Sequence, residues 1–296
     1  MPNMNLRDRA RAINAHVQEE VRSVGAPDVR SSVDPGRGTG AQFDPASWTI
    51  YYGEGVVNGP VDAAQLGAMF DTGTHEAHHA YQWFQMARYA AETGGTRIFD
   101  QIPPDVAGLA QAAPPLTPTE RATAARWHDS VFGANRNDRN AAYADMNAYE
   151  RSTEVANADL DRVMNDPNAT AADRERATEA RDIERALFDD AYERYRTLPE
   201  EMTAWQRGGV ADADAGALMQ LRDLAGRVTA GNKLLAELRG MHAPSQNIER
   251  VTQALFSDTL MYEKVFANLA ASPLEFVRTM ANQTDTRRQI AATFGA

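Results

Sequence analysis

A single stretch organises this chain: Thr74-His75-Glu76-Ala77-His78-His79-Ala80-Tyr81-Gln82. It contains the spacing His-Glu-x-x-His, in which His75 and His79 stand four residues apart and Glu76 follows the first histidine. On an α-helix, residues i and i+4 lie one turn apart on one face, so the two imidazoles can bind one metal ion. The intervening carboxylate can reach a water molecule on that metal. The stretch therefore predicts a helix with a zinc site, His75 and His79 as ligands and Glu76 as general base.

The surrounding sequence supplies a helix for this motif. Apolar residues recur at helical spacing from 61 to 92, Gly73 is expected to break or bend the helix, and Gly94 and Gly95 are expected to end it. The aromatic and β-branched run 47–52 predicts a strand just upstream, and 56–57 is expected to return as a second short strand.

The rest of the chain predicts helices. They are expected at 6–24, at 104–112, from a Thr117–Glu120 capping box to 132, at 138–165, at 171–196, from Thr197 to a stop at Gly208-Gly209, and in the tail at 214–228, 231–240, 245–271 and 273–293, with a loop at 25–40. The segments 138–165 and 171–196 predict an antiparallel hairpin. The fold class is therefore mostly α with a small β element (α+β), with one domain at 1–210 and a helical C-terminal region at 211–296.

Composition limits the function classes. The chain has 296 residues, 43% of them hydrophobic, a net charge of -11 and no cysteine. Nucleic acid is excluded as a partner by the negative charge, and thiol catalysis and Cys-ligated zinc by the missing cysteine. Neither a signal peptide nor a membrane span is expected. The expectation is a protein that is cytoplasmic as synthesised, and export without a cleaved signal is compatible with it.

Alternative metal sites fail for lack of partners. A di-iron site needs a second Glu-x-x-His, and none of the other histidines has a glutamate three residues before it. A three-histidine site needs another histidine soon after the motif, but the next one is His128. The third ligand is therefore expected to be a carboxylate from a later helix. Glu200 and Glu201 are the two candidates, because they lie in a newly started helix rather than on the charged hairpin.

With these two acids included, the sequence resembles bacterial zincin metallopeptidase domains that serve as toxin or effector modules, some of them associated with contractile injection systems. The resemblance covers about 42 to 208. The matching residues are a strand with Trp48, then His75, Glu76, His79, Ala80, Gln82, Trp83 and Phe84, then Tyr195, Arg196, Leu198, Pro199, Glu201, Ala204 and Trp205. His78 departs from the pattern, which more often has arginine there.

The resemblance implies a minimal zincin core with Zn²⁺ held by His75, His79 and Glu201, and a protein or peptide substrate. A secretion or injection apparatus is the further partner it implies. The resemblance also implies that the strand from Trp48 to Tyr52 is an edge that pairs with an extended substrate, as zincin edge strands do. Tyr192, Tyr195 and His78 are candidate donors to the oxyanion of the tetrahedral intermediate, and Gln82 is a candidate second-shell residue. The competing hypothesis is a helical structural or interaction protein whose zinc site is structural or idle.

Overall fold

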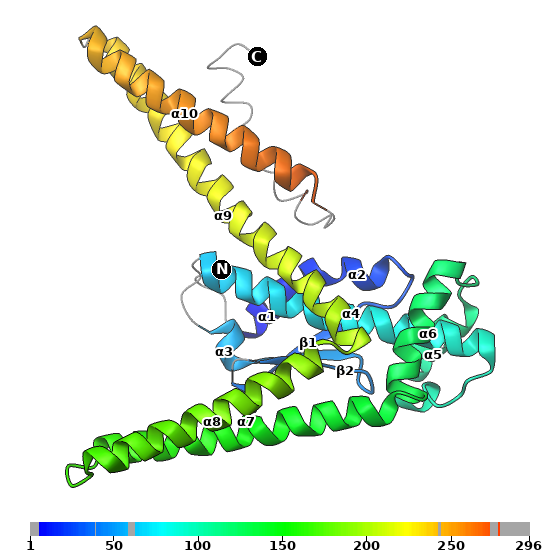
Figure 1. Cartoon of the computed structure of the whole chain (residues 1–296). Coiled ribbons are helices and arrows are strands. Elements are labelled where there is room, and N and C mark those ends of the chain that lie inside the picture. The colour runs from blue at the N-terminus through cyan, green and yellow to red at the C-terminus, as the bar shows by residue number, and fades with distance from the viewer. Residues whose placement is uncertain (1–5, 39, 59–62, 242–243, 273–277, 279–296) are drawn as a thin grey trace. The chain divides into compact units, whose positions relative to one another are not determined.

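The computed structural model describes residues 6–38, 40–58, 63–241, 244–272 and 278 (Figure 1). Among these residues, helices dominate and three short strands form one sheet, which confirms the expected mostly α class with a small β element. The strands are β1 (Arg30–Asp34), β2 (Ala41–Asp44) and β3 (Thr49–Gly53). The helices are α1 (Leu6–Val17), α2 (Glu19–Arg22), α3 (Glu54–Val57), α4 (Ala63–Thr93), α5 (Pro104–Ala112), α6 (Pro118–Phe132), α7 (Arg136–Asn165), α8 (Ala171–Arg196), α9 (Pro199–Gly240) and α10 (Ser245–Ala270), with 3-10 turns η1 (Pro35–Arg37) and η2 (Phe99–Gln101).

The chain forms two compact units. One contains the described residues up to Asp44, those from Trp48 to His78 and those from Arg207 onward, and the other contains Pro45–Ser47 and His79–Gln206. Helices α4 and α9 each contribute to both units. The domain boundary expected at 210 falls inside α9, which is continuous there, and the division into 1–210 and 211–296 stays a prediction.

The sheet has the order β1-β3-β2, with β3 parallel to β1 and antiparallel to β2. Strand β3 confirms the strand predicted at 47–52, but it lies in the centre, so the expectation that it is a free edge is wrong. Its Ile50 and Tyr52 are fully buried. The second strand expected at 56–57 is also wrong: these residues form α3, in which both valines are buried side by side.

Strand β1 lies within the segment expected to be a loop, and contacts from α1 and from Gln18, the residue after it, explain why it is ordered. The buried Gln18 side chain both donates to the Val29 carbonyl, at 3.0 Å, and accepts from the Val29 amide, at 2.7 Å. Asn14 donates to the same carbonyl. These bonds hold the chain directly before β1, and Ile13 and Val17 of α1 are buried.

Two glycines expected to interrupt helices lie inside continuous helices. A Cβ on Gly73 of α4 would lie 2.8 Å from Ile13 Cγ2 and 3.2 Å from the Tyr52 hydroxyl. A Cβ on Gly208 of α9 would lie 2.2 Å from Asp71 Oδ1. Both positions need glycine for close packing, which offsets its poor helix propensity. The predicted stop at Gly208-Gly209 is therefore wrong.

The second unit follows the sequence prediction closely. Helix α6 starts with the Thr117–Glu120 capping box, and α5 has the expected bounds. Helices α7 and α8 form the expected antiparallel hairpin: Ser152 and Thr153 of α7 both donate to Glu184 of α8, and Asp145 pairs with Arg194. Thus the pairing runs from the middle of the hairpin towards its base.

Helices α9 and α10 share an apolar core in the first unit and lie side by side (Figure 1). The buried residues of this apolar core are Phe70, Ala211, Leu218, Leu221, Leu224, Val228, Leu235, Leu255, Tyr262, Val265, Phe266 and Leu269. The helix expected at 245–271 is thereby confirmed as α10, whereas the one expected at 273–293 lies outside the described residues apart from Arg278. None of the described helices combines the length and apolar character that a membrane span requires.

Candidate metal centre

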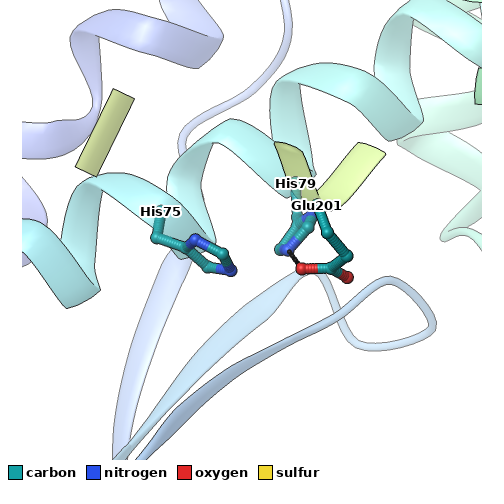
Figure 2. A group of neighbouring side chains, drawn as sticks. All are labelled: His75, His79 and Glu201. Carbon is teal, nitrogen blue, oxygen red and sulfur yellow. Dashed lines mark ion pairs between the residues drawn. The ribbon is translucent and has the colours of Figure 1, made fainter. Parts of the chain in front are cut away.

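Helix α4 carries the motif as the sequence predicts. His75 and Glu76 are 6% and 8% exposed, and the His79 side chain is 14% exposed. The two imidazoles lie one turn apart on the same side of α4 (Figure 2). A histidine pair at this spacing on a surface helix would be mostly solvated, so its burial sets it apart from an accidental cluster.

The first turn of α9 separates the two acidic candidates. Successive residues on a helix point about 100° apart. Accordingly, Glu200 Oε1 accepts from Arg139 Nε at 2.7 Å, while Glu201 Oε2 lies 3.4 Å from His79 Nε2. Both glutamates are 3% exposed. A negative charge is favourable in this first turn because the helix dipole is positive there.

His75, His79 and Glu201 come together as a group that could hold a metal ion (Figure 2). Their nitrogen and oxygen ligand atoms all lie within 4.8 Å of one another. Ligands at about 2.0–2.1 Å from a tetrahedral zinc are roughly 3.3 Å apart. The His79–Glu201 separation of 3.4 Å fits that value. Two imidazoles and one carboxylate also match the donor set of open zinc sites, so the residues fit the group that the sequence predicts.

The Glu76 carboxylate is oriented by strand β2. Its Oε2 accepts the Phe43 backbone N–H at 2.6 Å, and its Oε1 lies 4.0 Å from His75 Nε2. Burial, together with the negative charge of Glu76, raises the pKa of Tyr52 far above its ordinary value, so this phenol stays protonated. Glu76 thus has one oxygen fixed by the backbone and the other on the side of His75.

Of the three predicted oxyanion donors, Tyr192 and Tyr195 share one aromatic group and His78 lies apart from it in sequence. The Tyr192 ring centroid lies 6.2 Å from that of Tyr195 and 6.1 Å from that of Trp205. The Arg196 guanidinium lies over the Trp205 ring of the same group. His78, within the motif, is buried at 4% exposure. Their role in stabilising an oxyanion stays a prediction.

Three hydrogen bonds around the site were not foreseen from the sequence: from the Phe43 amide to Glu76, from the Arg139 guanidinium to Glu200, and from the Gln82 amide to the Thr203 hydroxyl. The Gln82 side chain, predicted to contact a metal ligand rather than the metal, lies 2.8 Å from His79 Nδ1. Almost every residue type has a backbone amide, so the sequence gives no sign that the amide of Phe43 binds Glu76. The Arg139 contact joins residues 61 positions apart, so no local pattern could reveal it.

Comparisons with known proteins leave the assignment to the chemistry of these residues, and the resemblance to zincin domains stays a prediction. No protein-family model, no curated protein and no solved structure matches the chain.

Proposed function

We propose that this protein is a zinc-dependent peptidase in which His75, His79 and Glu201 are the metal ligands. The observation that carries the proposal is the buried group of two imidazoles and one carboxylate, with Glu76 next to the first imidazole. These residues come from two segments about 120 positions apart in the sequence. A chance cluster of acidic residues on the surface would not bring two imidazoles and a carboxylate from distant segments together in a buried position.

The ligand set determines what the metal would contribute. Zinc held by two histidines and one carboxylate keeps a position for water and lowers the pKa of that water to about 7. Imidazole nitrogens bind in the neutral form, and the negative charge of Glu201 is partly offset by the metal. The carboxylate of Glu200 is engaged by Arg139 instead, so we assign it no ligand role.

Glu76 acts as the general base. The Phe43 amide holds Oε2, which leaves Oε1 to accept a proton from the attacking water. The same carboxyl group then delivers that proton to the leaving amine of the peptide. The Tyr52 phenol stays neutral and therefore adds no second negative charge beside Glu76.

Protein or peptide is the proposed substrate class. Delivery as a toxin or effector by an injection apparatus is part of the same proposal, and its support is the resemblance of 42–208. The alternative, a helical interaction protein with an idle zinc site, finds support in the α7–α8 hairpin, whose buried residues within the hairpin helices are few and small: Ala142, Thr153, Ala177 and Ala191.

The test compares two Glu→Gln variants on α4 for zinc content and for hydrolysis of a fluorescently labelled, unfolded casein. Glu76→Gln is expected to keep one zinc per chain and to lose hydrolysis by at least about a hundredfold, the lower end of what a general base contributes. Glu92→Gln is the matched control, because Glu92 also accepts a backbone amide, that of Leu116. Hydrolysis by Glu76→Gln at the wild-type rate would rule out Glu76 as the general base. Wild-type protein that binds zinc but hydrolyses nothing would favour the interaction protein.

A further inference from the structure

We propose that Gln82 is a positioning residue that fixes the tautomer of His79. It keeps the proton on Nδ1, so that Nε2, the atom facing Glu201, carries the free lone pair. The Gln82 amide is itself held by a hydrogen bond to the backbone of Glu200, in the first turn of α9, which also contains Glu201. The link to zinc binding rests on the proposed function, whereas the tautomer itself can be measured without metal.

The orientation of the Gln82 amide follows from its three contacts. Gln82 is 1% exposed. One end of the amide lies 2.7 Å from the Glu200 backbone oxygen and 2.8 Å from Thr203 Oγ1, and the other end lies 2.8 Å from His79 Nδ1. A backbone carbonyl oxygen only accepts hydrogen bonds, so the end that faces Glu200 must be the NH₂ group. The reverse orientation would place two oxygens 2.7 Å apart and leave both without a proton.

The tautomer of His79 follows from that orientation. The Gln82 oxygen has no proton, so the hydrogen bond to His79 requires a proton on Nδ1. A neutral imidazole carries one N–H, and its other nitrogen then has a lone pair. That nitrogen, Nε2, is the atom 3.4 Å from Glu201 Oε2 (Figure 2). A buried side chain with fixed partners thus presents the ring in the form that a metal needs.

The same bonds connect the tautomer to the start of α9. The two acceptors of the Gln82 amide belong to Glu200 and Thr203, which lie on either side of Glu201 in the sequence. Arg139 fixes the Glu200 side chain at 2.7 Å. Therefore the helix turn that brings the carboxylate to His79 also orients the amide that sets the state of His79. Nearby Gln85, equally buried, contacts Tyr81 and Arg88 instead and serves as a control.

The first experiment reads the tautomer by long-range ¹H–¹⁵N NMR on the metal-free full chain, labelled with ¹⁵N-histidine. A His79→Gln sample assigns the resonance among the six imidazoles. At a pH where the ring is neutral, wild type is expected to show His79 protonated at Nδ1 and not at Nε2. Gln82→Leu removes the acceptor at Nδ1 and is expected to lose this form, whereas Gln85→Leu is expected to retain it. A wild-type His79 protonated at Nε2 would overturn the proposal whatever the variants do, as would an unchanged tautomer in a folded Gln82→Leu chain.

The second experiment measures Zn²⁺ affinity by chelator competition. Gln82→Leu is expected to bind about 10–100-fold more weakly than wild type, the usual loss for a residue that orients a ligand. Gln85→Leu is expected to bind as wild type does. Equal affinities in all three chains would overturn the proposed influence on binding. If wild type shows the expected tautomer yet binds no zinc, the positioning of His79 stands and the proposed peptidase function fails.

Discussion

The buried ion pair between Arg139 and Glu200 gives the sharpest prediction about stability. Glu200 is almost fully buried, with a side chain 5% exposed, and Arg139 is 25% exposed. Glu200 Oε1 accepts from Arg139, and Oε2 has no hydrogen-bond partner among the described residues. Arg139→Leu would therefore leave a buried carboxylate with neither charge partner nor donor. We expect a loss of about 3 kcal/mol in the free energy of unfolding, the lower end for a broken buried pair because Arg139 is partly solvated.

A double-mutant cycle tests this value. Glu200→Leu alone leaves the more exposed Arg139 without its partner, and the double variant removes both charges, so it should be more stable than Arg139→Leu. Urea unfolding followed by tryptophan fluorescence reports on this region, since Trp83, Trp127 and Trp205 all lie in the unit that contains 79–206. A loss below about 1 kcal/mol for Arg139→Leu, the range of an exposed pair, would refute the reasoning.

Two further predictions concern stability. Gly208→Ala should destabilise by about 1–3 kcal/mol because its Cβ would clash with Asp71. Gly209→Ala should stabilise by up to about 1 kcal/mol, because no atom of the described residues would lie within 4 Å of its Cβ. Equal shifts of the two variants in urea midpoint would refute the packing argument. Thr117 hydrogen bonds lower the pKa of Glu120 from 4.5, so its stabilisation is full above pH 4.5 and is lost as the pH falls through the lowered pKa. Glu120→Gln should therefore lose less stability on acidification than wild type, as acid titrations of unfolding would reveal.

Local sequence signals predicted the elements that depend on local chemistry. The Thr117–Glu120 capping box, the helix with His75 and His79, and the α7–α8 hairpin need only helical periodicity, capping residues and a loop. Strand β1 was missed because Arg30–Asp34 is polar and short. It is ordered by pairing with β3 and by Gln18 at Val29, both of which are tertiary contacts.

The candidate site likewise has one part that the sequence predicts and one part that depends on tertiary contacts. The spacing of His75, Glu76 and His79 follows from the motif alone. The residues themselves left Glu200 and Glu201 equivalent, and only the resemblance favoured Glu201. The structure separates them through the angle between neighbouring helix positions and through Arg139, which lies 61 residues from Glu200. The continuity of α9 through Gly208 was likewise unpredictable, because the reason for that glycine is its contact with Asp71.

The measurement that tests the central claim most directly is the zinc affinity of two neighbouring variants, Glu201→Gln and Glu200→Gln, beside wild type. Wild type should bind one Zn²⁺ per chain. Glu201→Gln should bind more than about a hundredfold more weakly, since loss of a ligand costs more than loss of an outer partner. Glu200→Gln should bind as wild type does, because its amide oxygen can still accept from Arg139. Undiminished zinc binding by Glu201→Gln would contradict the account.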